Sequence, residues 1–222
     1  MKRQNMDDQS LIEEQCLIIS GGDYEDIPPY MHKIKMVIAC DRGWEYAKKL
    51  GYKPNVVIGD FDSSEAPEDG AEIIRLPERK DDTDTMYAAR YALKLGYKKI
   101  NICCAFGGRL DHTVANIQTA AFLARNGAFV RMMGKDTEAF VFTAADKVID
   151  GRDGYSLSVF ALSDSCEGVT ICGTKYEVEN IGLCDSFPVG VSNLWKDDRA
   201  EITVKSGVLM VLMSRLNNGE HI

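Results

Sequence analysis

Short apolar runs alternate with helical segments along about the first two thirds of this chain, and this alternation limits its fold more than any other feature. Three helical segments are each closed by a glycine, at Gly51, Gly96 and Gly127, a residue that readily takes the left-handed conformation at a helix end. Because strands joined through helices pair in parallel, the order predicts a mostly parallel sheet flanked by helices. The apolar runs fall at residues 16–20, 36–40, 56–58, 72–76, 100–105, 128–133 and 139–142.

The pattern changes after about residue 145, where short apolar segments are separated by glycine and polar turns without helical periodicity. Such spacing is typical of antiparallel β structure, and the 222 residues suffice for one large or two modest cores. We therefore predict an α/β fold with an α/β domain at residues 1–145, followed by an antiparallel β-sandwich domain at residues 146–222. The later apolar segments are residues 155–162, 169–172, 200–204 and 208–213.

Composition argues against several classes of function. The net charge of −8 disfavours a nucleic-acid partner, because neutralising phosphates needs clustered Lys and Arg. No apolar run approaches the roughly 20 residues of a membrane span, and no leader resembles a signal peptide, so we expect a cytoplasmic protein without membrane insertion. The seven cysteines, which include the adjacent Cys103 and Cys104, lack metal-ligand spacing, and we expect them to be reduced.

Polar residues cluster directly after the predicted strands. In an open parallel sheet the carboxyl ends of the strands border the ligand crevice, so residues that follow different strands can meet there. The number of carboxylates at one end of one sheet indicates a site rather than a set of turns. The candidates are Gly21, Gly22, Asp41, Asp60, Asp62, Asp81, Asp84, Gly107, Gly108, Arg109 and Asp111.

Each candidate also has a purely structural interpretation. The glycine pair after the first strand can be a simple turn, and Asp81 or Asp82 can cap the following helix. Asp84 suits a first helical turn, where carboxylates favour the helix dipole. Asp111 can likewise be a cap, and Arg109 a surface residue.

A divalent cation would convert the mutual repulsion of these carboxylates into coordination. We expect magnesium or another divalent ion, with Asp60, Asp62 and Asp84 as candidate ligands, although magnesium usually takes only one or two protein carboxylates together with phosphate oxygens. Arg109 suits a phosphate clamp because its planar fork makes paired hydrogen bonds. His112 can contact a nucleotide or be structural. The chain contains no P-loop motif.

Three motifs in this order and spacing resemble those of the thiamine pyrophosphokinase family, also called thiamine diphosphokinase. They are Gly-Asp-Phe-Asp-Ser at residues 59–63, Asp-Asp-Thr-Asp at residues 81–84, and Gly-Gly-Arg-Leu-Asp-His at residues 107–112, with Asn116 one turn further. The resemblance covers nearly the whole chain, since that family joins an α/β catalytic domain to a β-sandwich thiamine-binding domain.

The resemblance implies transfer of the terminal pyrophosphoryl unit of ATP to the hydroxyl of thiamine, giving thiamine diphosphate and AMP. It also implies magnesium and a homodimer with thiamine near the subunit interface. Asp60 and Asp62 then match the metal and triphosphate end of the site, and Ser192 with Asn193 matches the pair near the thiamine pyrimidine. Trp195 can stack on the thiamine ring or be a buried sandwich residue.

The remaining roles follow the same matching. We expect Asp84, Asp111 and Arg109 to be catalytic, with either aspartate able to accept the proton of the thiamine hydroxyl. The expected nucleotide-binding residues are Gly21, Gly22, Asp41, Asp81, Gly107, Gly108, Arg109 and His112.

Three other functions fit part of the same pattern. A pyrophosphokinase acting on another alcohol, such as a pterin, would share the acidic end, but Ser192 and Asn193 in a β-sandwich favour thiamine. A magnesium-dependent phosphohydrolase would release phosphate from ATP without an acceptor. A binding module that senses nucleotide or thiamine would form no AMP, and it would not require so many carboxylates.

Overall fold

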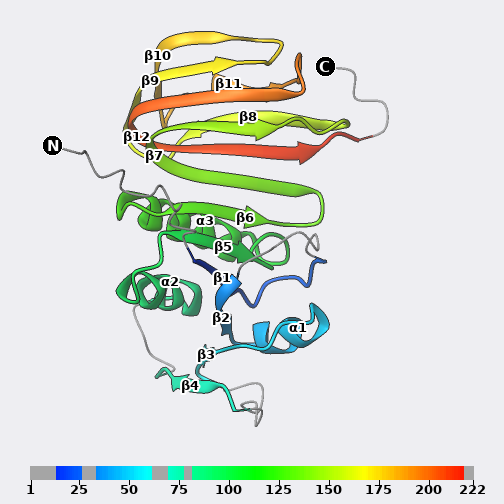
Figure 1. The fold of residues 1–222 in the computed structure, drawn as a ribbon, viewed down its shortest axis with the longest axis vertical. Coiled ribbons are helices and arrows are strands. Elements are labelled where there is room, and N and C mark those ends of the chain that lie inside the picture. The colour runs from blue at the N-terminus through cyan, green and yellow to red at the C-terminus, as the bar shows by residue number, and fades with distance from the viewer. Residues whose placement is uncertain (1–13, 27–33, 62–69, 78–81, 218–222) are drawn as a thin grey trace, which may run out of the picture.

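The computed structural model describes residues 14–26, 34–61, 70–77 and 82–217 as one twelve-stranded sheet with three helices (Figure 1). The helices are α1 (Gly43–Lys49), α2 (Asp84–Lys94) and α3 (Leu110–Arg125). The strands are β1 (Gln15–Ile19), β2 (Ile34–Cys40), β3 (Val56–Gly59), β4 (Glu72–Arg75), β5 (Lys99–Cys103), β6 (Phe129–Met133), β7 (Thr137–Asp150), β8 (Tyr155–Ala161), β9 (Ser165–Cys172), β10 (Val178–Cys184), β11 (Gly190–Asn193) and β12 (Arg199–Arg215).

The first six strands pair in parallel, in the spatial order β6-β5-β1-β2-β3-β4. Strand β1 lies between β2 and β5, and its residues Cys16 to Ile19 are fully buried. A strand with helices over both of its faces has no solvent side, which explains its continuous apolar sequence.

The helices cover both faces of this parallel part. Helices α2 and α3 lie on one face with small residues against the sheet, among them Ala88, Ala92 and Ala120, and α1 lies on the other face (Figure 1). Helix α1 begins at Gly43, where an added Cβ would lie 2.3 Å from the carbonyl oxygen of Ile19. Glycine is therefore needed for α1 to start directly on the end of β1.

The sheet changes direction at β7, which runs antiparallel to both β6 and β12. Strand β12 pairs with β7 along most of its length, while its other edge pairs with β9 through its first half and with β8 through its second half. Between Val204 and Val208 the register shifts, and Gly207 has a φ of 89°. This β-bulge lets one strand serve both pairings.

These observations confirm the predicted class, a parallel α/β part followed by an antiparallel β part. The two segments expected at 200–204 and 208–213 are the two halves of β12, because the Gly207 bulge interrupts the apolar pattern without ending the strand. Strand β7 continues across residue 145, so the sheet is unbroken there. The division into domains 1–145 and 146–222 stays a prediction. None of the helices in the described part of the chain has the length and apolar character needed to cross a membrane.

A buried carboxylate fastens the junction between the two parts of the sheet. Glu138 on β7 is 4% exposed and accepts hydrogen bonds from Nε of Arg131 on β6 and from Nη2 of Arg152, the latter at 2.7 Å. Because Arg152 lies in the turn before β8, one carboxylate joins three segments.

We expect Glu138→Ala to destabilise the fold by about 3–5 kcal/mol, because it removes the buried carboxylate that both partly buried guanidinium groups contact. Asp150→Ala is the matched control. It removes an ion pair with Arg199 in which the Asp150 side chain is 84% exposed, so its cost should stay below about 1 kcal/mol. Urea unfolding of both variants measures the difference, and equal losses would contradict a role for burial.

Candidate active site

The strands of the parallel part end at one edge, and three non-glycine residues just beyond them have positive φ. They are Asp41 after β2 (48°), Phe61 after β3 (56°) and Cys104 after β5 (53°). Such conformations cost of order 1–3 kcal/mol each and persist only where the surroundings enforce them, commonly at functional sites. This edge is the candidate active site.

Asp41 lies between the ends of two neighbouring strands. Its backbone N–H donates to the carbonyl oxygen of Ile58 at 2.9 Å. Its Cβ lies 3.6 Å from the position that a Cβ on Gly21 would occupy, and its Oδ1 lies 2.6 Å from that of a Cβ on Gly59. Since Gly59 directly precedes Asp60, the absent side chain lets the Asp41 carboxylate approach the acidic segment after β3.

Helix α2 brings Asp84 to the same edge. Thr83 is the N-cap, and its hydroxyl accepts the N–H of Met86 at 3.1 Å. The expectation that Asp81 or Asp82 caps this helix is therefore wrong for Asp82, and Asp81 lies outside the described residues. Asp82 instead pairs with Arg90. The hydroxyl of Thr85 lies 2.9 Å from that of Ser20, both of them buried, which fixes the half-buried Asp84 beside the end of β1.

The Gly-Gly pair after β1 contacts the segment after β5. The N–H of Gly22 donates to the carbonyl oxygen of Cys104 at 3.0 Å, and an added Cβ on Gly22 would lie 2.5 Å from that oxygen. The two predicted glycine elements therefore meet, and the close backbone approach explains the glycine at position 22.

Asp23 is a residue that the sequence interpretation missed. Its Oδ2 lies 2.8 Å from where a Cβ on Gly107 would be, and its Oδ1 lies 3.0 Å from the equivalent position on Gly108. Both glycines have positive φ, of 78° and 60°. The exposed Asp23 carboxylate thus lies against the Gly107–Gly108 turn. The signal in the sequence that could have identified Asp23 is its position shortly after the strand predicted at residues 16–20.

Arg109 and Asp111 form a two-pronged ion pair at the start of α3. Nε and Nη2 of Arg109 donate to Oδ1 and Oδ2 of Asp111 at 3.1 and 2.5 Å. These hydrogen bonds, with a further one from the N–H of His112 at 2.9 Å, lower the pKa of Asp111 below its ordinary 3.8. All three residues are exposed. Asn116 behind them is buried and donates to the carbonyl oxygen of Ala105 at 2.9 Å.

In the antiparallel part, Asn193 is occupied by the protein itself. Its Nδ2 donates to Oγ1 of Thr174 and to the carbonyl oxygen of Tyr176, at 3.0 and 2.8 Å. Its Oδ1 accepts the N–H groups of Tyr176 and Leu194, at 3.0 and 2.9 Å. Both amide hydrogens and both acceptor positions are used, which assigns Asn193 the task of positioning its neighbours.

Ser192 and Trp195 flank this amide. Ser192 has a φ of 59°, and its N–H donates to Oγ of Ser158 at 3.0 Å. Trp195 is half-buried, its Cε3 lies 3.3 Å from the position of a Cβ on Gly151, and its Nε1 is buried without a hydrogen-bond partner within the described residues. Both the packing and the stacking interpretations of Trp195 thus remain predictions.

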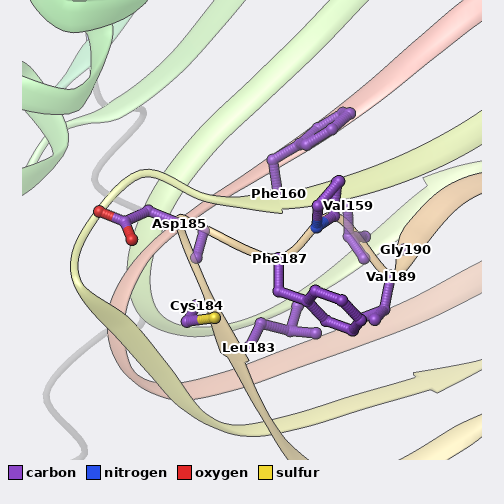
Figure 2. A pocket seen from close by; sticks show the side chains of 10 residues that line it. Val159, Phe160, Leu183, Cys184, Asp185, Phe187, Val189 and Gly190 are labelled. Carbon is purple, nitrogen blue, oxygen red and sulfur yellow. The ribbon is translucent and has the colours of Figure 1, made fainter.

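The antiparallel part also contains an apolar cavity of about 220 Å³ with Asn193, Tyr176 and Val191 among its lining residues. A smaller pocket shares Val159, Leu183, Val189 and Gly190 with it. Figure 2 shows this pocket, with Phe187 and Val189 of the loop between β10 and β11 beside Leu183.

The metal ligands predicted from the sequence are only partly described. Asp62 and Asp81 lie outside the described residues. Within the ranges that the structure describes, no three His, Cys, Asp or Glu side chains converge as a metal site. Asp60 is half-buried directly after β3.

Comparison with known proteins places this geometry in a family. The chain matches the model described as "Thiamin pyrophosphokinase, catalytic domain" over residues 27–131, and that described as "Thiamin pyrophosphokinase, vitamin B1 binding domain" over residues 147–209. The chain belongs to the thiamin pyrophosphokinase family. The catalytic match spans the acidic edge, and the B1-binding match contains Ser192, Asn193 and Trp195.

Individual thiamine pyrophosphokinases resemble the chain over most of its length. The Bacillus subtilis (strain 168) enzyme is 25% identical over 207 residues, which are 89% of this chain and 97% of that protein. A crystal structure of the B. subtilis enzyme covers 91% of this chain and 99% of its own, with a TM-score of 0.79 at 24% identity. The Candida albicans enzyme covers 91% and 89%, with a TM-score of 0.72 at 16% identity. These matches confirm the predicted fold class and the predicted thiamine diphosphokinase family.

A further carboxylate of this chain, Glu25, lies after β1 and contacts the turn after β6. Its Oε1 accepts the N–H of Lys135 at 3.2 Å, while its Oε2 is buried without a hydrogen-bond partner within the described residues. Burial raises the pKa of Glu25 above its ordinary 4.5, against the lowering effect of the Lys135 hydrogen bond.

A carboxyl whose pKa is raised by folding stabilises the fold below its unfolded pKa, and this contribution is lost as pH rises through the folded pKa. We expect Glu25→Gln to gain thermal stability relative to the natural chain between pH 4 and pH 8. A gain of about 1 kcal/mol would raise Tm by roughly 2–4 °C. Glu179→Gln, at an exposed position, should show a Tm difference that does not change with pH. A Glu25→Gln difference that is equally constant would contradict the burial effect.

Proposed function

We propose that this chain transfers the pyrophosphoryl unit of ATP to the hydroxyl of thiamine, giving thiamine diphosphate and AMP, and that the acidic edge of the parallel sheet is where the transfer occurs. The observation that carries the proposal is the order of the two family matches, catalytic and then B1-binding, along most of the chain. Asp41, Asp60 and Asp84 at the strand ends supply the chemistry that such a transfer requires.

The nucleotide binds, in this proposal, to the two glycine elements and Arg109. At Gly21 and in the Gly107–Gly108 turn there is no side chain, so phosphates can approach the backbone closely. Arg109 already makes a two-pronged contact with the Asp111 carboxylate. Two phosphate oxygens offer the same planar geometry, so Arg109 can exchange its partner without a new conformation.

The donor set at this edge fits a magnesium ion. Asp60 follows β3, the Asp41 carboxylate approaches Gly59, and Asp84 begins α2, so the available donors are the hard oxygens that magnesium prefers. We assign Asp60 and Asp84 as ligands of this ion. Asp62, which lies outside the described residues, is a third candidate from the sequence. Magnesium at this position would spread the negative charge that develops on the bridging oxygen during transfer.

Of the two candidate bases, Asp84 is the better one, because one of its carboxylate oxygens can hold the metal while the other accepts the proton. The Arg109 hydrogen bonds lower the pKa of Asp111, which makes Asp111 a weaker proton acceptor and a better partner for orienting Arg109. Asp84 is held by the Thr83 cap and by the Ser20–Thr85 contact. A fixed carboxylate beside the reacting oxygen assists by position and by accepting the proton.

Thiamine binds, in the same proposal, with the help of the antiparallel part. Ser192 and Trp195 are the substrate-contacting candidates, while Asn193 holds the backbone on either side of them. The positive charge of thiamine suits the acidic edge, and it also suits the face of the Trp195 ring. A cytoplasmic location stays the prediction made from the sequence.

We expect the purified protein to form AMP from ATP and magnesium only when thiamine is present, in equal amount to thiamine diphosphate. Chromatography of the nucleotides measures both products. Asp84→Asn should lower kcat by roughly 100-fold or more, because proton acceptance contributes on that order. Asp82→Asn, which removes only the partner of Arg90, should retain near-normal turnover and serves as the matched control.

The other outcomes distinguish the remaining functions. ATP consumption that is equal with and without thiamine would indicate a phosphohydrolase. AMP formed only with a pterin alcohol would indicate a different acceptor. Binding of both ligands without any AMP would indicate a sensing module. An active Asp84→Asn variant would remove Asp84 from the mechanism while leaving the reaction intact.

We also propose that the protein is a homodimer whose interface lies over the cavity of the antiparallel part. Tyr176, Phe187, Val189 and Val191 are 50–67% exposed and surround the cavity and the adjoining pocket. An apolar surface of this kind favours association with another chain.

We expect the double substitution Phe187→Asp and Val191→Asp to convert a dimer into monomers, because each interface would then bury four carboxylates. Light scattering coupled to size-exclusion chromatography gives the mass directly. Leu95→Asp introduces the same kind of charge at another exposed apolar position, 46% exposed at the end of α2, and should leave the dimer intact. A natural chain that is monomeric at all concentrations would refute the proposed interface.

A further inference from the structure

Two adjacent thiols point to the same face of the sheet at the end of β5. Along β5, Ile100 and Ile102 pack into the core under α2 and α3, whereas Cys103 packs into the smaller core under α1. Strict alternation would return Cys104 to the first face. The left-handed φ of 53° at Cys104 instead places it in the α1 core together with Cys103.

The two thiols interact with each other. The neighbouring Cys103 thiol, together with the backbone N–H of Glu25, lowers the pKa of Cys104 against the raising effect of burial. Burial raises the pKa of Cys103. Both sulfurs therefore lie in one buried core, directly beside each other in the chain.

A disulfide is a poor product for this pair. Neighbouring Cα atoms are about 3.8 Å apart across a trans peptide, which is shorter than the roughly 4.4–6.8 Å of ordinary disulfides. A larger atom placed between the sulfurs bonds to both without drawing them to S–S bonding distance. Thiolate sulfur is also the ligand that soft cations prefer.

We propose that Cys103 and Cys104 form a dithiol site for a soft, thiophilic ion, with trivalent arsenicals as the class that suits a two-sulfur site. With an organic arsenoxide, the two S–H bonds and the As–O double bond are replaced by two As–S bonds and one water. No electrons are transferred, so the step needs no oxidant or reductant.

Access to the site depends on the segment that follows β1. Both thiols are 0% exposed. They are covered by Tyr46 and Ala47 of α1 and by the segment around Gly22, whose N–H donates to the Cys104 carbonyl oxygen. Opening of this segment admits a ligand by local unfolding, so the reaction is slower than at an exposed thiol.

The same contact connects the dithiol to the proposed nucleotide loops. The segment after β1 carries Gly21 and Gly22, and the chain runs from Cys104 directly into the Gly107–Gly108 turn. A ligand that holds both sulfurs displaces this covering segment from its position on Cys104. This coupling rests on the proposed function, whereas the dithiol site does not depend on it.

The experiment uses the full chain with its exposed thiols removed by Cys172→Ser and Cys184→Ser. The native protein is incubated with phenylarsine oxide for several hours, freed of excess reagent, unfolded and alkylated with iodoacetamide. We expect a one-to-one adduct in intact-mass spectra and two fewer alkylated thiols. ATP with magnesium should slow adduct formation at least tenfold, and the adduct should lose thiamine-dependent AMP formation.

Cys104→Gly is the decisive variant. Glycine accepts the left-handed φ at this position, so the variant should fold, with an unchanged circular dichroism spectrum, and its adduct should weaken at least tenfold. Cys166→Ala is the matched control because Cys166 is equally buried in the other core, and it should keep the adduct.

The outcomes separate the site from the function. No adduct in the native chain, or an undiminished adduct in Cys104→Gly, would overturn the dithiol site even if thiamine diphosphate forms normally. The coupling to the loops would be overturned if ATP does not slow adduct formation, or if the adduct keeps its thiamine-dependent turnover. If the natural chain makes no thiamine diphosphate, the adduct mass and the thiol count still decide the site.

Discussion

The parallel pairing of β1 with both β2 and β5 is the constraint on which the rest of the structure depends. Because neighbouring strands run in one direction, their carboxyl ends share an edge, and everything that follows a strand arrives there. The pairing continues past the strand ends, since Ser20 and Gly22 donate to the carbonyl oxygens of Cys103 and Cys104. Without this extension the glycine segments after β1 and β5 would be independent loops. With it they form one surface.

The antiparallel part is attached to this surface through the sheet itself. Strand β6 pairs in parallel with β5 and antiparallel with β7, so backbone hydrogen bonds run from the acidic edge into the second part. The buried Glu138 adds a charged link at the same junction. Relative motion of the two parts would break strand pairing and this ion cluster together. The B1-binding region is therefore held in a defined position relative to the catalytic region within one chain.

Sequence reasoning succeeded where one local signal determined the outcome. Each of the three closing glycines follows a helix that the structure contains, and the apolar runs became strands, although β4 at the sheet edge is mostly exposed. It failed where two signals competed. Carboxylates were expected to cap α2, but Thr83 is one residue closer to the helix and takes that role. The bulge at Gly207 resembled a turn, because a glycine within an apolar pattern has the same appearance in both cases.

The details of the candidate site were less predictable because they depend on contacts between distant segments. Asp23 is exposed, and only the structure shows that its carboxylate lies against the Gly107–Gly108 turn. Contact of Asn193 with substrate stays a prediction, and the structure adds that four hydrogen bonds with residues 174, 176 and 194 use its whole amide. The sequence alone does not indicate that every hydrogen-bonding position of this amide is used. The family resemblance predicts which residues belong to the site, and the structure adds which hydrogen bonds their side chains already make within the protein.

The strained residues at the acidic edge connect stability with function. Asp41, Phe61 and Cys104 each hold a conformation that disfavours side chains, and together this costs on the order of several kcal/mol. Parallel strands can support the cost because their cores are continuous and fully buried. The strain has a geometric result at two of these residues: the Asp41 carboxylate approaches Gly59, and Cys104 lies in the same core as Cys103. A glycine at either position would relieve the strain and remove the functional group, so the side chain and its unfavourable φ have to be retained together.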